Sequence, residues 1–79
     1  MNINNPIGLG ALVRNRRKQM KVNQTELAMT CGTGLRFIVD LEKGKPTCQI
    51  GKVLAVLKVL GLAIEVNTPH GNENGESMT

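Results

Sequence analysis

Apolar side chains recur at helical spacing in four stretches of the chain, residues 7–20, 24–31, 34–43 and 48–60. In the first stretch, the apolar Leu9, Val13 and Met20 lie on one face together with Arg17, and such a repeat predicts an amphipathic helix. The two middle stretches are short, and helices of that length do not persist alone in water, so we expect them to be held by packing. The pattern therefore predicts a small all-α domain.

The two middle stretches carry helix-capping residues at their ends. Asn23 offers a side-chain oxygen to the free N–H groups of a first turn, and Glu26 adds a favourable negative charge there. Gly32 and Gly44 follow the last turns, where glycine adopts the left-handed conformation without steric cost. Two short helices with a Cys-Gly-Thr-Gly break between them predict a helix-turn-helix motif. The side chains predicted to face inward are Leu27, Ala28, Cys31, Ile38 and Leu41.

The last helical stretch follows Pro46, and Thr47 is its expected cap. Its predicted core stripe is Ile50, Val53, Leu54, Leu57 and Leu60. Ala55, Val56 and Val59 extend the apolar surface beyond that stripe, and a helix that is apolar nearly all round is normally buried on both sides. The second face therefore indicates a partner subunit.

Residues 62–66 alternate apolar and other side chains, which is a strand pattern in an otherwise helical chain. A lone strand leaves its backbone groups unpaired, so we expect it to pair with the same strand of a two-fold mate. The alternative is a short extended tail that packs on the preceding helix. The predicted dimerisation residues are Val56, Val59, Leu62, Ile64 and Val66.

Charge and composition divide the chain into three parts. We expect residues 1–6 to be a flexible arm, 7–66 the folded domain, and 67–79 a disordered acidic tail rich in Asn, Gly and Glu. Residues 1–60 carry all ten Lys and Arg against three acidic side chains, a net charge of +7, whereas residues 61–79 carry three Glu and no Lys or Arg. Such a basic domain either attracts a polyanion or simply has a soluble cationic surface.

The sequence lacks the residues that other function classes need. Cys31, Cys48 and His70 have no metal-ligand spacing, and there is no carboxylate dyad, Cys/His pair or phosphate loop, so we expect no metal, no cofactor and no enzyme activity. No signal segment or membrane span is recognisable, so we expect a cytoplasmic protein with reduced thiols.

Arg17 places a full charge on the buried face of the first helix. An unpaired buried guanidinium costs several kcal/mol, so it requires a carboxylate. Glu42, next to the inward-facing Leu41, is the predicted partner in a structural ion pair.

The outward face of residues 34–43 is the candidate DNA-reading surface. Arg36 can donate two hydrogen bonds to guanine, and Asp40, one turn later, could hold its guanidinium. The alternatives are that Arg36 only pairs with Asp40 or contacts a phosphate. Leu35 and Val39 could touch a thymine methyl. The candidate phosphate-binding residues are Gln24, Thr33, Lys43, Lys45, Arg14 and Lys18, with Arg16 and Lys21 also predicted to point outward; the alternative for each is a solvated basic face.

The segments Gln24-Thr-Glu-Leu-Ala28, Gly32 and Ile38-x-x-Leu-Glu-x-Gly44 resemble the Xre, or lambda-repressor-like, helix-turn-helix family over residues 9–60. Residues 36–47 and 53–62 are similar to HipB-type antitoxins. The resemblance implies a four- to five-helix domain that dimerises, binds a palindromic operator in double-stranded DNA and is associated with the nucleoid. It also implies a repressor of its own operon that neutralises a HipA-type serine/threonine kinase toxin. The alternatives are an ordinary Xre-family repressor without a toxin and a module that binds a kinase-like partner.

Overall fold

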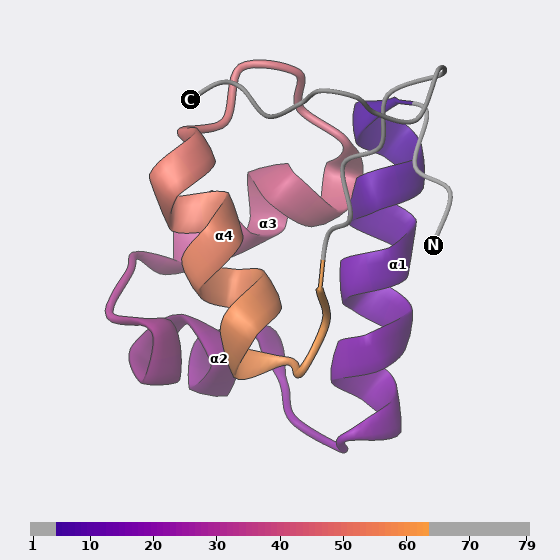
Figure 1. Cartoon of the computed structure of the whole chain (residues 1–79). Coiled ribbons are helices and arrows are strands. Elements are labelled where there is room, and N and C mark those ends of the chain that lie inside the picture. The colour runs from indigo at the N-terminus through magenta and orange to yellow at the C-terminus, as the bar shows by residue number, and fades with distance from the viewer. Residues whose placement is uncertain (1–4, 64–79) are drawn as a thin grey trace, which may run out of the picture.

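Four helices follow one another along residues 5–63, the part of the chain that the computed structural model describes. They are α1 (Pro6–Gln19), α2 (Gln24–Cys31), α3 (Leu35–Lys43) and α4 (Ile50–Val59). In Figure 1, α1 forms one side of the domain and α4 the other, with α3 between them. α3 packs against α1 and α2, and α2 also packs against α4. The predicted all-α fold is confirmed, and residues 64–66 of the predicted strand lie outside the described part.

The predicted caps of the two middle helices are present. The side chain of Asn23 accepts a hydrogen bond from the backbone N of Glu26 at 2.8 Å, and the carboxylate of Glu26 accepts one from the backbone N of Asn23 at 2.8 Å. Gly32 and Gly44 end α2 and α3 with φ of 70° and 86°. α1 begins one residue earlier than predicted, at Pro6, because Asn5 caps it.

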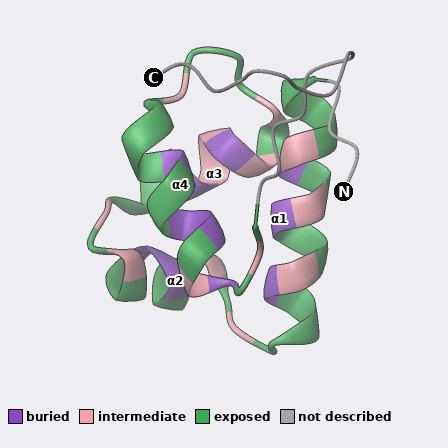
Figure 2. Cartoon of the chain, in the orientation of Figure 1, coloured by how far each residue is buried: buried purple, intermediate pink, exposed green. Residues whose placement is uncertain are grey.

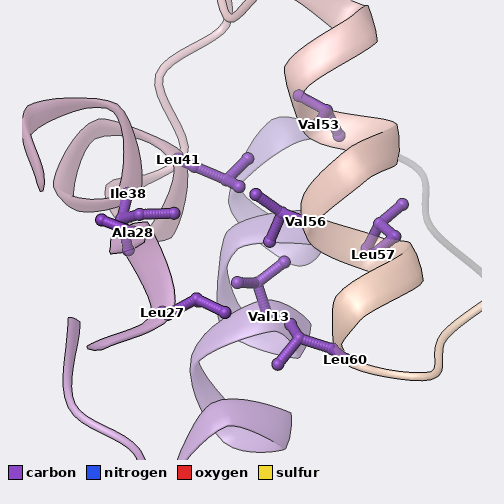
Figure 3. Packing of buried hydrophobic residues seen from close by; sticks show 9 residues of the cluster. All are labelled: Val13, Leu27, Ala28, Ile38, Leu41, Val53, Val56, Leu57 and Leu60. Atoms are coloured by element: carbon purple, nitrogen blue, oxygen red, sulfur yellow. The ribbon is translucent and has the colours of Figure 1, made fainter. Parts of the chain in front are cut away.

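Nine buried side chains from all four helices form one apolar core (Figure 3). The buried positions line the inner sides of the helices in Figure 2. The core residues are Val13, Leu27, Ala28, Ile38, Leu41, Val53, Val56, Leu57 and Leu60. Both faces of the helix-turn-helix motif that were predicted to point inward therefore contribute to the core.

The inward face of α4 differs from the prediction. Val56, expected on a dimer surface, is fully buried, so that assignment is wrong. Ile50 and Leu54, expected in the core stripe, are 68% and 49% exposed. Because α4 is apolar nearly all round, helical periodicity alone could not select the face that packs. The cap expected from Thr47 is also absent, since α4 starts after Gln49.

The other predicted dimerisation residues fall into two groups. Val59 and Leu62 are partly buried and pack against the core of the same chain. Ile64 and Val66 lie outside the described residues. The apolar surface that α4 leaves exposed is therefore centred on Ile50 and Leu54.

Two contacts with backbone carbonyl groups of other segments fix α1 in the fold. A side chain at Gly10 would place its Cβ 2.7 Å from the carbonyl oxygen of Glu42, so glycine lets α1 lie directly against the end of α3. Arg16, predicted to point outward, instead donates from Nε to the carbonyl oxygen of Leu60 at 2.8 Å and thereby caps the end of α4. Among residues 5–63, no helix is long and apolar enough to cross a membrane.

Candidate nucleic-acid interface

An ion pair that is almost completely buried joins α1 to α3 at the base of the candidate interface. The guanidinium of Arg17 donates from Nε to Oε2 of Glu42 at 2.6 Å and from Nη2 to Oε1 at 3.0 Å. Its Nη1 also donates to the carbonyl oxygen of Val22 at 2.9 Å. The hydrogen bond to Glu42 raises the pKa of Arg17, although burial acts in the opposite direction. Glu42 is thus the carboxylate that the buried position of Arg17 requires.

The same carboxylate holds the side chain at the start of α2. Gln24 donates from Nε2 to Oε1 of Glu42 at 3.1 Å. Gln24 is the first residue of α2, where the free N–H groups of the helix also point outward. One carboxylate therefore connects three helices and fixes the position of a predicted phosphate-binding side chain.

α3 has one buried and one exposed face. Ile38 and Leu41 are buried against the core, whereas Leu35 is 46% exposed and the side chain of Arg36 is 87% exposed. Lys43 is exposed at the end of the helix, and Val39 is half-buried. The structure thus places all four predicted base-reading residues on α3 and gives Arg36 the greatest freedom to reach a ligand.

A hollow of about 300 Å³ lies on one flank of α3. It brings together Arg14 of α1, Gln24 of α2 and Lys43 of α3, which were each predicted to bind phosphate. Its lining is Arg14, Gln24, Val39, Glu42 and Lys43. Lys18 is exposed on α1 but does not line this hollow.

A second hollow, of about 170 Å³, lies where α3 meets the start of α4. It contains Lys45, predicted to bind phosphate, and Lys52, which the sequence reasoning missed. The ammonium of Lys52 lies 5.8 Å from the centre of the Phe37 ring. The signal that could have identified Lys52 is its position in the first turn of the fourth helix, directly after the lysine-containing connection. The residues that line this second hollow are Phe37, Asp40, Lys45, Thr47, Cys48, Gln49 and Lys52.

Thr33 does not present its hydroxyl to a ligand. The Oγ1 atom is buried and has no hydrogen-bond partner among residues 5–63, and the backbone N donates to the carbonyl oxygen of Ala28 at 2.9 Å. The buried hydroxyl gives no support to the predicted phosphate contact of Thr33, which stays a prediction.

The two cysteines are free and half-buried. Burial raises the pKa of the Cys31 thiol, which disfavours the reactive thiolate. Within the described ranges no group of three His, Cys, Asp or Glu side chains is placed to hold a metal ion.

Two capped helices joined at a glycine turn, with the second helix exposed between two basic hollows, define a helix-turn-helix domain of the DNA-binding type. No protein-family model matches the sequence. A curated relative, the uncharacterized HTH-type transcriptional regulator y4mF of Sinorhizobium fredii (strain NBRC 101917 / NGR234), is 58% identical over 67 residues, which are 85% of this chain and 88% of the relative. The chain therefore belongs to the HTH-type transcriptional regulators.

Solved structures of HipB have the same fold. HipB in a HipA-HipB-O2-O3 complex and in a HipB-O4 20mer complex each give a TM-score of 0.78 at 22% identity, over 87% of this chain and 97% of HipB. The curated relative thus confirms the predicted helix-turn-helix regulator family, and the HipB structures confirm the predicted fold.

Proposed function

We propose that this regulator is a dimeric repressor that binds a palindromic operator in its own promoter and places α3 in the major groove. The observation that carries the proposal is the exposed Arg36 face of α3 between the two basic hollows. A recognition helix needs cations on both flanks, because the phosphate chains of the duplex border the major groove on both sides.

The residues of the interface have separate roles in this proposal. Arg36 reads a guanine, and Leu35 and Val39 contact neighbouring base edges, with Asp40 beside them. On one flank Arg14, Gln24 and Lys43 contact one phosphate chain, and Lys18 extends that contact along α1. On the other flank Lys45 contacts the second chain, and the position of Lys52 in the same hollow adds it to this group.

Binding to the DNA of its own promoter tests the operator proposal. We expect Arg36→Ala to lose about 1–3 kcal/mol of operator binding and to relax sequence choice, whereas Lys45→Ala should weaken binding to all sequences alike. Affinities for operator and random duplexes at two salt concentrations would separate the two roles. Equal losses on both duplexes for Arg36→Ala would contradict base reading by Arg36.

The proposed dimer combines the exposed face of α4 with residues 62–66. Ile50 and Leu54 are two exposed apolar side chains one helical turn apart on α4, which favours contact with a second copy. Leu62 packs against the core, so the start of the proposed strand is held in a fixed position. Ile64 and Val66 remain the proposed strand contacts between the two copies.

Truncation after Gly61 should yield monomers with weak operator binding, because each monomer then holds only one half-site. The mass in solution, measured by light scattering, gives the direct answer. The matched variant Leu54→Lys keeps residues 62–79 and should also shift the dimer toward monomer. If both variants remain dimeric, the proposed interface is wrong.

We further propose that the repressor acts as an antitoxin toward a HipA-type serine/threonine kinase. The support is the shared fold with HipB, which the HipA-HipB-O2-O3 structure shows together with HipA. A kinase reading frame beside this one in the genome, and co-purification of that kinase from the native host, are the expected results. If the regulator is purified from the native host without any kinase, and no kinase gene lies beside its own, it would instead be an ordinary Xre-family repressor.

A further inference from the structure

Asp40 lies between two cations that face the proposed DNA surface. Its Oδ1 is 3.4 Å from Nε of Arg36, one turn earlier on α3, and its Oδ2 is 3.6 Å from Nζ of Lys45, in the connection to α4. Asp40 itself is only 22% exposed, whereas the side chains of Arg36 and Lys45 are 87% and 52% exposed. The carboxylate is therefore the fixed member of the group, and the two cations are the mobile ones.

The contact with Arg36 uses the Nε edge of the guanidinium. No hydrogen bond from Arg36 to another protein atom is found among the described residues, so its terminal nitrogens stay available to a ligand. A guanine edge requires two parallel N–H donors from the same side chain. Asp40 thus limits the orientations of the fork without occupying the donors that a base would use.

The position of Asp40 beside Lys45 weakens phosphate binding. A phosphate that approaches Lys45 also approaches the carboxylate of Asp40, and like charges repel. Exposed ion pairs are weak, so the Lys45 pair can open, but the negative charge of Asp40 stays beside the phosphate site. Binding that relies on phosphates alone is therefore weakened.

We infer that Asp40 is a specificity-determining residue, which directs Arg36 toward bases and penalises DNA binding that uses phosphates alone. The inference rests on the proposed operator binding and deepens it. Because a base contact by Arg36 offsets the repulsion only on the correct sequence, Asp40 raises the ratio of specific to nonspecific affinity. Asp40 is a positioning residue in this role, not itself a required base contact.

The test compares Asp40→Asn with the unchanged protein on a pool of duplexes with a randomised core. The sequence that the unchanged protein enriches serves as the specific probe, and a shuffled duplex of the same composition serves as the nonspecific one. We expect Asp40→Asn to lower the ratio of specific to nonspecific affinity about tenfold. This factor is near the low end of the discrimination that one bidentate base contact provides. Nonspecific binding should tighten. The slope of its log affinity against log salt concentration should steepen by about the amount that one phosphate contact contributes.

Glu26→Gln is the matched control for the loss of one negative charge. Glutamine keeps the acceptor for the backbone N of Asn23, so the capping box of α2 remains, and Glu26 pairs with neither Arg36 nor Lys45. We expect this control to leave the affinity ratio unchanged. A ratio that falls equally in both variants would overturn the inference, because net charge alone would then explain the effect.

A second comparison separates the two parts of the mechanism. In an Arg36→Ala background, Asp40→Asn should tighten binding to the enriched and the shuffled duplex alike, so the affinity ratio should no longer fall. If the ratio still falls in this background, the positioning of Arg36 is overturned. An unchanged protein that enriches no sequence would overturn the inference together with the proposed operator binding, and this failure is distinct because it needs no variant. Urea unfolding of Asp40→Asn verifies that the fold is intact.

Discussion

Replacing Glu42 by glutamine leaves the shape of the buried side chain nearly unchanged but removes its charge. Arg17, only 7% exposed, would then keep its positive charge without a carboxylate. Two of its three hydrogen bonds go to Glu42, and the remaining one goes to the carbonyl oxygen of Val22. The variant therefore isolates the contribution of the counter-charge from the contribution of packing.

The expected loss is large for a domain of this size. Removing one partner of a buried pair costs about 3–5 kcal/mol, because the other charge stays buried without compensation. The side chains of Arg17 and Glu42 are 9% and 4% exposed, so solvent screens the pair little. Domains of fewer than about 80 residues rarely gain more than 3–5 kcal/mol from one apolar core. We expect Glu42→Gln to lose about 3 kcal/mol, since the amide oxygen can still accept one bond.

Urea unfolding followed by far-ultraviolet circular dichroism measures this loss. Glu26→Gln is the control, because that side chain is exposed and glutamine preserves its cap. The double variant Arg17→Met/Glu42→Leu should regain the stability of the unchanged protein to within about 1 kcal/mol, since apolar side chains of similar volume often replace a buried pair at no cost. A loss below about 1 kcal/mol for Glu42→Gln would refute the reasoning.

Three further substitutions test single structural features by the same unfolding measurement. Lys21 has φ of 61°, so Lys21→Gly should raise the free energy of unfolding by about 0.5–1 kcal/mol through relief of left-handed strain; a loss would show that Lys21 makes compensating contacts. Thr33→Val removes a buried hydroxyl that has no described partner and should stabilise by about 1 kcal/mol without weakening DNA binding. Gly10→Ala should destabilise by about 1–3 kcal/mol, because its methyl group would meet the carbonyl oxygen of Glu42; an unchanged stability would mean that α1 shifts freely.

The sequence predicted those features that depend on local chemistry. The capping box at Asn23 and the glycine that ends each middle helix follow from a few neighbouring residues. The partner of Arg17 was also predictable, because the first three helices carry only three carboxylates, and the other two, Glu26 and Asp40, were already assigned to the cap of α2 and to Arg36. These predictions needed no knowledge of how the helices pack.

Features that depend on packing were not predictable in the same way. Val56 and Leu54 are equally apolar, so only the position of α4 against the other helices decides which of them is buried. The roles of Gly10 and Arg16 depend on backbone atoms more than thirty residues away. The hydroxyl of Thr33 fits the phosphate pattern in sequence, but the turn places it inside the domain.

The carboxylate of Glu42 links the stability of the domain to the geometry of its proposed DNA surface. Oε1 accepts from both Arg17 and Gln24, so the ion pair that joins α1 to α3 also positions the first side chain of α2. In the double variant Arg17→Met/Glu42→Leu, packing can replace the stabilising effect, but leucine offers no acceptor to Gln24. We therefore expect a stable protein whose operator affinity falls about threefold to tenfold, as for the loss of one positioned hydrogen bond. An affinity equal to that of the unchanged protein would show that the hydrogen bond from Gln24 to Glu42 does not affect DNA binding. Glu42 would then contribute only to the stability of the fold.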